Sequence, residues 1–259
     1  MDLEVSASMS VTAIIPACHG LPHGVRALLA QDTPVRVLVL SNGDGPTRVP
    51  GADVVKVEWQ GHGLTRQAAL AHVDTEFVFF TVDDAVCLGR DCIRVLVEAL
   101  EAGGWDAVTA QQVPCADADP ITVDRLRRWT PPGEQVVVTA QVDHVAALYR
   151  AETLRQHPLP SVPIAEDAWW SRGRRVAYVP AARVQHTHKR EPMALYRRNR
   201  AIHAELIRMG QEPRVPSLAA LVRALPGVVR PTLKAGPGEL GNQMAELLGQ
   251  WQGSREARR

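Results

Sequence analysis

Two adjacent carboxylates, Asp83 and Asp84, directly follow an apolar stretch at residues 77–82, FVFFTV. Its aromatic and β-branched residues are typical of a central strand that is buried on both faces. Ligands bind at the carboxyl ends of the strands in open α/β sheets, so the two acids are candidates for a site there. Neighbouring carboxylates repel each other unless a cation is shared between them, and their oxygens suit Mg²⁺ or Mn²⁺. The alternative is a strand that ends in two solvated acids, because Asp is common in loops.

A second acidic pair, Glu166 and Asp167, begins a predicted helix at residues 165–172. The same helix carries two indoles, Trp169 and Trp170. Acids at the start of a helix interact favourably with the helix dipole, which is a purely structural explanation. The functional interpretation is a general base beside an aromatic wall, where a carboxylate takes a proton from an acceptor hydroxyl and an indole stacks on a sugar ring.

Two histidines, His186 and His188, stand two residues apart at the end of a predicted strand, so both imidazoles can face one site. An imidazole together with a carboxylate is a suitable ligand set for Mn²⁺. A basic cluster follows, which either solvates a helix face or binds a diphosphate. It comprises Lys189, Arg190, Arg197, Arg198 and Arg200. The adjacent histidines favour the anion-binding interpretation.

Composition and charge exclude several classes of protein. The 259 residues are 46% apolar and 22% charged, which fits a soluble globular domain with or without an appendage. A net charge of +1 gives no overall attraction to nucleic acid, so we expect no nucleic-acid partner. The four cysteines form no CxxC pair, which indicates buried or incidental thiols rather than a zinc site. The sequence shows neither a membrane-span run nor the features of a signal peptide, which predicts a cytoplasmic protein.

Three common site motifs are absent or broken. Gly43 and Gly45 follow a predicted strand, but Arg48 occupies the place of the third glycine of a dinucleotide-binding motif. Pro46 and Pro50 would also disrupt the helix that such a motif needs to hold a pyrophosphate. The sequence has no GxxxxGK[ST] motif, which excludes a P-loop nucleotidase. It also has no GxSxG motif, so no residue is identified as the nucleophile of a hydrolase.

Strands and helices are expected to alternate through the first half of the chain. The apolar patterns predict strands at residues 10–16, 35–40, 53–57, 77–82 and 106–113. A short helix begins near Val25, a second is capped by Thr65 and runs to about Val73, and a third ends at Gly103. This alternation predicts an α/β fold with a mostly parallel central sheet, flanked by helices that make right-handed crossovers.

The second half of the chain is expected to differ in character. Residues 114–134 are predicted to be irregular, two short strands follow at 136–139 and 142–149, and two edge strands at 175–180 and 182–186 are separated by a turn. We divide the chain into a domain at residues 1–192, with a donor half at 10–113 and an acceptor half at 114–192, and a helical extension at 193–259.

The helical extension carries apolar stripes along three predicted helices. One helix follows His188, a second is ended by Pro226, and a third is defined by Leu240, Met244, Leu247, Leu248 and Trp251. These stripes are too large to be left in water, which predicts packing on the domain or on a second subunit as a homodimer. The alternative is that these helices contact the inner face of a membrane peripherally, because basic residues lie beside the apolar ones in the sequence. These basic residues are Arg223, Arg230 and Lys234.

These segments, taken in order, resemble the family 2 glycosyltransferases of the GT-A fold, a Rossmann-like fold of nucleotide-diphospho-sugar transferases. The resemblance extends over residues 11–200 and rests on six segments: VTAIIPACHG, VRVLVLSNGDG, GHGLTRQAAL, FVFFTVDDAV, AEDAWW and RVAYVPAARVQHTH. It implies a nucleotide-sugar donor, a hydroxyl acceptor and Mn²⁺ or Mg²⁺ as cofactor.

The resemblance also implies roles for individual residues. Asp84 would bind the metal, with His186 as the favoured further ligand over His188. The nucleotide sugar would be contacted by Pro16, Ala17, Ser41, Asn42, Gly43, Arg66, Asp83, Lys189 and Arg197. Asp167 would be the general base of an inverting, single-displacement transfer, and Glu166 would support it. Trp169 and Trp170 would contact the acceptor.

The sequence departs from the family pattern at several positions. Ser41 replaces the usual Asp after the second strand, Val82 replaces the first acid of the commonest acidic motif, and Gln67 replaces Asn. The segment after Asp167 is also shorter than usual. We therefore expect a metal-dependent glycosyltransferase that uses a UDP- or dTDP-sugar, with a cell-surface glycan, a lipid-linked intermediate or a natural product as acceptor. The alternatives are a catalytically inactive relative that binds nucleotide sugar and, less favoured, a nucleotidyltransferase on a similar sheet.

Overall fold

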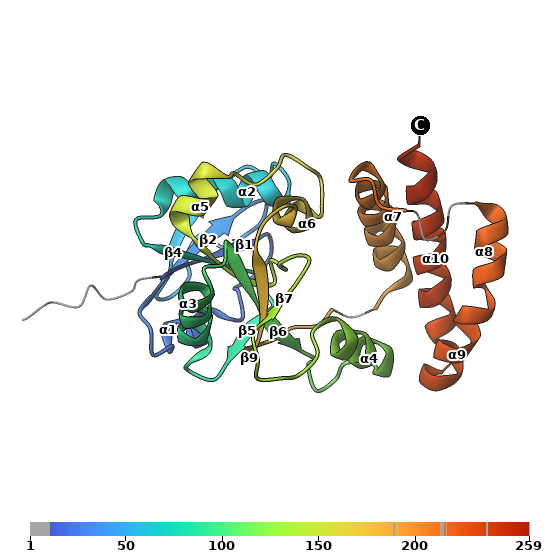
Figure 1. The fold of residues 1–259 in the computed structure, drawn as a ribbon, viewed down its shortest axis with the longest axis horizontal. Helices are drawn as coiled ribbons and strands as arrows, with labels where there is room; N and C mark the ends of the chain where they lie inside the picture. Colours follow the sequence, from blue (N-terminus) through green and yellow to red (C-terminus); the bar gives the residue numbers. More distant parts are fainter. Residues whose placement is uncertain (1–10, 189, 213–214, 216, 237, 259) are drawn as a thin grey trace, which may run out of the picture. The chain divides into compact units, whose positions relative to one another are not determined.

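The computed structural model describes residues 11–188, 190–212, 215, 217–236 and 238–258 (Figure 1). Within these residues the chain forms two compact units. The first unit comprises residues 11–115, 126–161 and 166–187, and the second comprises 116–125, 162–165 and 188–258. The first unit contains the whole sheet and both acidic pairs.

The first unit is built on a mixed sheet with the strand order β3-β2-β1-β4-β8-β6-β9-β5, and β7 pairs with β9. β1 lies parallel to β2 and β4, β2 is parallel to β3, and β6 is parallel to β9, whereas β5, β7 and β8 run antiparallel to their neighbours. The bounds are β1 Val11–Ala17, β2 Val35–Ser41, β3 Asp53–Lys56, β4 Phe77–Thr81, β5 Val86–Leu88, β6 Ala107–Val113, β7 Val137–Val138, β8 Ala146–Arg150 and β9 Val176–Gln185. The predicted α/β class with a mostly parallel central sheet is confirmed.

Helices cover both faces of the sheet, and the central strand, β4, contributes side chains to the hydrophobic core on each face. Alternate residues of β4 point to opposite faces, so that Phe77 and Phe79 join one core while Val78 and Phe80 join the other. One face is covered by α1 (Val25–Leu29) and α3 (Cys92–Gly103). The other face is covered by α2 (His62–Ala68), a 3₁₀ turn (Ala69–His72), α5 (Ala151–Gln156) and α6 (Glu166–Ser171) (Figure 1). Every residue of β4 is buried, as the apolar run predicted.

Two predicted boundaries are wrong for identifiable reasons. The segment at residues 114–134, predicted to be irregular, contains α4 (Pro120–Trp129). Asp119 explains this helix, because its Oδ1 accepts hydrogen bonds from the backbone N–H groups of Ile121 and Thr122, and Pro120 favours the first helical position. The second helix begins at His62 rather than at a Thr65 cap, after Gly61 in a positive-φ conformation. Thr65 Oγ1 instead accepts a hydrogen bond from the backbone N–H of Gln60.

The two predicted edge strands at residues 175–180 and 182–186 are one continuous strand, β9, which lies between β6 and β5. Pro180 lacks an N–H for the ladder, and the register with β6 is interrupted there: Ala110 pairs with Val179, but Gln111 pairs with Arg183. The irregularity therefore accommodates the proline without ending the strand. β5 and α5 were not predicted from the sequence.

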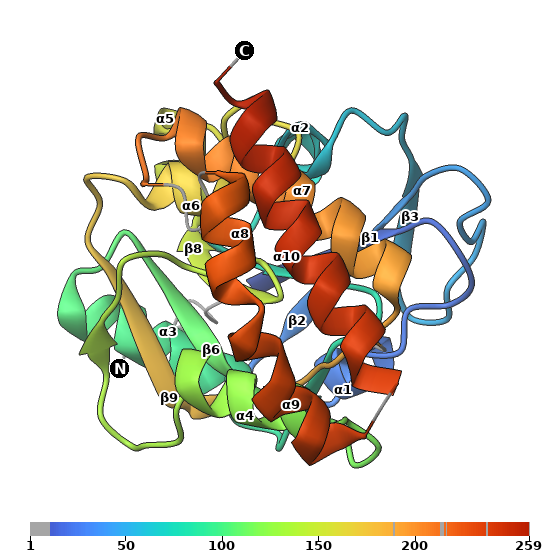
Figure 2. The same ribbon diagram turned by 90° about the vertical axis from the view of Figure 1, so that its right-hand side faces the viewer.

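The second unit is a helical bundle. α10 (Gly238–Glu256) packs along α7 (Pro192–Arg208) and also contacts α8 (Leu218–Ala224) and α9 (Pro226–Ala235) (Figure 2). Gly249 brings α10 close to α7, because a Cβ there would lie 2.5 Å from the backbone oxygen of Tyr196. None of the helices in the described part of the chain combines the length and apolar character that a membrane span requires.

The buried face of α10 consists of polar and small residues, which corrects the predicted apolar stripe. Leu240 and Leu248 are 50% and 37% exposed, whereas Glu239 and Glu246 are each 5% exposed. The two glutamates are buried because both pair with the guanidinium of Arg190, at 2.5 and 2.7 Å. Arg190 is thus engaged in a buried ion-pair network of the second unit rather than in a solvated basic flank.

Candidate active site

The first acidic pair lies in a tight turn between β4 and β5, as the Ala85 N–H to Val82 carbonyl hydrogen bond of 3.3 Å shows. Gly24 packs closely on this turn, since a Cβ at that position would collide with the carbonyl oxygen of Ala85. β5 pairs antiparallel with β9, with Val86 opposite Gln185. This pairing brings the residues just beyond it, Asp84 and His186, side by side.

His186 and Asp84 form the first half of the site. The distance from His186 Nε2 to Asp84 Oδ1 is 3.4 Å, and their side chains are 6% and 32% exposed. The backbone N–H of His186 donates to the carbonyl of Val113, which extends the β6–β9 ladder by one residue. The two side chains offer one imidazole nitrogen and one carboxylate oxygen, a donor pair that fits Mn²⁺ and, less well, Mg²⁺.

Gln112 determines which nitrogen of His186 faces the aspartate. The amide nitrogen of Gln112 donates to Asp143 Oδ2 at 2.7 Å, so its oxygen is the atom 3.2 Å from His186 Nδ1. An amide oxygen can only accept a hydrogen bond, and Nδ1 therefore carries the proton. In a neutral imidazole the lone pair is then on Nε2, the nitrogen that faces Asp84.

Asp167 forms the second half of the site, at the start of α6. Its Oδ1 accepts a hydrogen bond from the Ala168 N–H at 2.8 Å, and its Oδ2 accepts one from the His144 N–H at 3.4 Å. Burial raises the pKa of Asp167, His144 opposes this, and the charges of Asp143 and Glu166 raise the pKa further, to about 6. A carboxylate with a pKa near 6 is ionised at neutral pH and still basic enough to accept a proton.

Glu166 is held in a buried polar chain. Its Oε1 lies 3.0 Å from Arg66 Nη1 and 2.9 Å from His144 Nδ1, while His144 Nε2 lies 2.8 Å from the hydroxyl of Tyr149. Burial by itself would raise the pKa of Glu166, but the hydrogen bond and charge of His144 and the charge of Arg66 lower it to about 2. Glu166 therefore stays ionised and anchors α6, while the neighbouring Asp167 titrates near neutrality. Gly63 lets α2 approach, because a Cβ there would lie 3.1 Å from Glu166 Cβ.

Two predicted site residues are buried and engaged elsewhere. The side chain of Arg66 is 3% exposed and paired with Glu166, so we assign it to holding Glu166 rather than to contacting the nucleotide. Trp170 is 3% exposed, and its Nε1 donates to the carbonyl of His157 at 2.7 Å, so its indole is a core residue and not an acceptor wall. Trp169 is partly exposed, with the guanidinium of Arg172 5.4 Å from its ring centroid.

The remaining predicted donor residues lie mainly at the carboxyl ends of β1 and β2. Ala17 pairs with Ser41, and the Asn42 N–H donates to the Ala17 carbonyl at 3.0 Å, which joins the two strand ends. Ser41 is fully buried and Gly43 is exposed with a φ of +53°, which suits glycine. Pro16 is partly exposed on β1, Asp83 is partly exposed in the acidic turn, and Arg197 is exposed on α7 of the second unit. Lys189 lies outside the described residues, and the donor-binding roles stay predictions.

Sequence reasoning missed three residues of this centre: Gln112, Asp143 and His144. They form one hydrogen-bonded line, because Asp143 bonds the amide that orients His186 while the next residue bonds both Asp167 and Glu166. Asp143 and His144 interrupt a stretch that is otherwise apolar from Val142 to Tyr149, and such an interruption was the one available signal. The line connects the Asp84–His186 pair to the Asp167 carboxylate.

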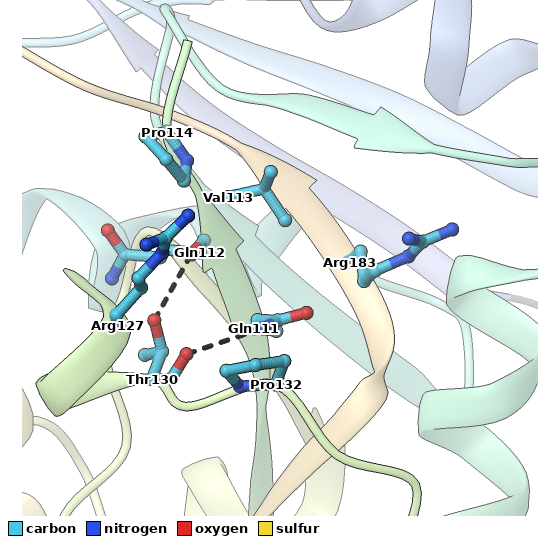
Figure 3. A pocket seen from close by; sticks show the side chains of 8 residues that line it. All are labelled: Gln111, Gln112, Val113, Pro114, Arg127, Thr130, Pro132 and Arg183. Carbon is cyan, nitrogen blue, oxygen red and sulfur yellow. Dashed lines mark hydrogen bonds between the residues drawn. The ribbon is translucent and has the colours of Figure 1, made fainter. Parts of the chain in front are cut away.

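A pocket of about 290 Å³ opens beside this line (Figure 3). Its lining consists of Gln111, Gln112, Val113, Pro114, Arg127, Thr130, Pro132 and Arg183. The Thr130 hydroxyl donates to the backbone oxygen of Gln112 at 3.1 Å, and the Gln111 amide donates to the backbone oxygen of Thr130 at 3.3 Å (Figure 3). Gln112 therefore contributes to the pocket wall and also orients His186.

No protein-family model matches the chain. The chain is 27% identical to an O-antigen chain rhamnosyltransferase, RfbN, of Salmonella typhimurium, with 73% of this chain and 70% of the relative covered. Among solved structures, a mannosyltransferase from Pyrobaculum calidifontis in complex with GDP-Man and Mn²⁺ matches with a TM-score of 0.64 at 19% identity, over 93% of this chain and 85% of that chain. The S. aureus TarS fragment 1-349 in complex with UDP-GlcNAc matches with a TM-score of 0.53 at 13% identity, over 96% of this chain and 92% of that chain.

The chain has the fold of these glycosyltransferases, the GT-A fold. A further match has the same fold: GalNAc-T7 with UDP, GalNAc and Mn²⁺ has a TM-score of 0.57 at 9% identity, over 71% of this chain and 45% of that chain. In this chain the Asp84–His186 pair and the Asp167 carboxylate both belong to the first unit, which carries the sheet.

The Arg66–Glu166 pair should matter for the stability of the protein. Replacing Arg66 by Met leaves a buried carboxylate without the guanidinium that pairs with it, and we expect a loss of about 3 kcal/mol in the free energy of unfolding. The matched control is Arg36→Met, which breaks surface pairs with Asp53 and Asp74 and should cost less than about 1 kcal/mol, because the arginine is 38% exposed and the two acids are 58% and 82% exposed. Denaturant unfolding of both variants measures the difference, and equal losses would contradict the role of the buried pair.

Proposed function

We propose that the protein is a metal-dependent, inverting glycosyltransferase of family 2. It transfers a sugar from a nucleoside-diphosphate donor, a UDP- or dTDP-sugar, to a hydroxyl of a cell-surface glycan, a lipid-linked intermediate or a natural product. The name of the curated relative makes rhamnose the first sugar to test. The cytoplasmic location expected from the sequence stays a prediction.

The observation that carries this proposal is the hydrogen-bonded connection between a cation-binding pair and a titratable base. His186 presents Nε2 beside Asp84, and Gln112 and Asp143 join this pair to the loop that supports Asp167. Such an arrangement supports a reaction in which charge develops on a leaving diphosphate while an acceptor hydroxyl loses its proton. Asp84 and His186 would hold Mn²⁺ or Mg²⁺, which when bound neutralises charge on the diphosphate.

Different residues have different roles in the proposed reaction. Asp167 takes the proton of the acceptor hydroxyl as that oxygen forms a bond to the anomeric carbon. The bond from this carbon to the diphosphate oxygen breaks in the same step, and the diphosphate leaves with the electron pair, so the anomeric configuration inverts. Glu166 and His144 keep Asp167 in place through α6 and the loop before β8. Trp169 is the aromatic side chain retained as a candidate for stacking on the acceptor sugar.

The first experiment is a calorimetric titration of UDP, dTDP, GDP and CDP into metal-free protein, with and without Mn²⁺. Metal-dependent binding of one nucleotide identifies the donor class and is the result we expect. Transfer from the matching nucleotide sugar to a panel of acceptors, with the anomeric configuration of the product read by NMR, then tests inversion. Binding of none of the four nucleotides would favour the catalytically inactive relative instead.

The rate of transfer should depend on pH through Asp167. The carboxylate must be ionised to accept a proton, and its pKa is raised to about 6. At saturating Mn²⁺ and donor we therefore expect a rate that is constant above about pH 7 and falls about tenfold for each pH unit below 6. A rate that increases as the pH falls below 6 would contradict the assignment of Asp167 as the base.

Gln112 should affect the affinity for the metal. Replacing it by Leu removes the acceptor for His186 Nδ1, so the imidazole proton is no longer held on that nitrogen. We therefore expect Mn²⁺ affinity to fall about 10–100-fold. The matched control is Gln111→Leu, because the neighbouring amide bonds Thr130. Electron paramagnetic resonance titration of Mn²⁺ measures both variants. Equal affinities in the two would show that Gln112 does not orient the ligand.

A further inference from the structure

Helices α8 and α9 present apolar side chains to solvent along one line. Leu218, Val222 and Leu225 follow at intervals of four and three residues and are 62%, 57% and 37% exposed. Leu225 itself has helical φ and ψ values of −55° and −40°, so the same face continues into α9. Leu233 lies two further turns along and is 81% exposed. An exposed apolar line of this length indicates a surface that contacts another apolar phase.

The line is separate from the face that packs inside the bundle. Leu221 of α8 and Val228 of α9 are only 8% and 4% exposed, and both helices contact α10. The two helices thus have one apolar face that is used internally and a second that is not. Internal packing of the second unit does not account for the exposed line.

The charge of this segment is one-sided. Residues 217–236 include three basic residues and no acidic one, whereas the whole chain has 29 basic and 28 acidic residues. Arg223 is exposed directly beside Val222. Apolar residues on one face and basic residues beside them are the features of a helix that lies in the interface of an anionic bilayer. Self-association through the same face would bring two positive segments together, which disfavours a second copy as the occupant.

We propose that α8 and α9 form a docking face for an anionic lipid surface, defined by Leu218, Val222, Leu225 and Leu233 with Arg223 at its border. The apolar side chains enter the boundary between headgroups and acyl chains, and Arg223 at their border contacts lipid phosphates. This inference goes beyond the proposed transfer reaction and does not depend on it. It favours lipid-linked acceptors over soluble ones, because the enzyme would be held at the surface where such acceptors lie.

The test is co-sedimentation of the full chain with vesicles, using phosphatidylcholine alone and phosphatidylcholine mixed with phosphatidylglycerol. We expect binding to the anionic vesicles, little binding to the neutral ones, and weaker binding at high salt. The double variant Leu218→Gln/Leu233→Gln should reduce the partition coefficient at least about tenfold, since each leucine loses most of its apolar contribution. The control is Leu21→Gln/Val138→Gln, whose two residues are 58% and 74% exposed on the first unit and should leave binding unchanged.

Three outcomes would overturn the proposal. The first is the absence of binding to anionic vesicles, and the second is equal losses in the double variant and its control. The third is a dimer in light scattering that the Leu218→Gln/Leu233→Gln variant dissociates, which would assign the face to a second copy. Nucleotide titration of the same variant keeps the two proposals separate, because donor binding should be unchanged whether or not the membrane is bound.

Discussion

The Asp167→Asn variant is expected to lose about 10²–10⁴-fold in the rate of transfer, the usual contribution of a general base. Asn keeps the shape of the side chain and its oxygen can still accept the Ala168 N–H, but the amide cannot take a proton from the acceptor. Donor affinity should change little, because Asp167 lies on α6 rather than at the predicted donor-binding strand ends. Steady-state kinetics should therefore show the loss in kcat and not in the donor KM.

Measuring the stability of Asp167→Asn distinguishes a loss of catalysis from misfolding. Burial raises the pKa of Asp167 in the folded protein, so the folded state binds the proton more tightly than the unfolded state. The associated stabilisation is fully present below the unfolded pKa and is lost as the pH rises through about 6. The neutral Asn avoids this loss but gives up the long hydrogen bond from the His144 N–H, so the variant should be within about 1 kcal/mol of the wild type at pH 8. The control Asp74→Asn alters a carboxylate whose side chain is 82% exposed and should retain full activity. Full activity of Asp167→Asn would refute its role.

The Asp84→Asn variant is expected to lose metal-dependent donor binding and at least about 10³-fold in transfer rate. A neutral amide binds a divalent cation more weakly than a carboxylate, and in the proposed reaction a bound cation would stabilise the leaving diphosphate, a contribution on the order of several kcal/mol. Calorimetry with Mn²⁺ and the nucleotide identified above measures the first effect, and a transfer assay measures the second. His186 remains in the β6–β9 ladder through its backbone, so the fold should be retained.

The matched control for Asp84 is Glu98→Gln, an exposed acid on α3 that pairs with Arg94 of the same helix at 2.9 Å. It changes the net charge by the same amount as Asp84→Asn. Full activity of Asp84→Asn without added metal would show that the reaction does not use a cation at this pair. Loss of activity with unchanged Mn²⁺ binding would give Asp84 a different role in the site.

The sequence alone predicted the elements whose pattern is local. The uninterrupted apolar run of β4 and the spacing of Ile93, Leu96, Val97 and Leu100 on α3 depend only on neighbours along the chain, and both elements form as expected. The order of strands and helices was enough to predict the fold class. The two acidic pairs were found because carboxylates at a strand end and at a helix start are recognisable from residue type and position.

The tertiary structure decided which of these residues meet. Arg66 and Glu166 are 100 residues apart in the chain, and their pairing depends on α2 packing against α6. Gln112 orients His186 only because β6 lies next to β9 in the sheet, an adjacency that residue periodicity does not encode.

The same reason explains the wrong predictions. Trp170 has an aromatic side chain of the kind that stacks on sugars, but its position on α6 directs it into the core beside Tyr149. The polar face of α10 is buried because Arg190, from a distant part of the chain, neutralises Glu239 and Glu246. Local patterns determine which elements form, whereas burial and ionic partners depend on contacts between distant segments, and those contacts exist only in the folded chain.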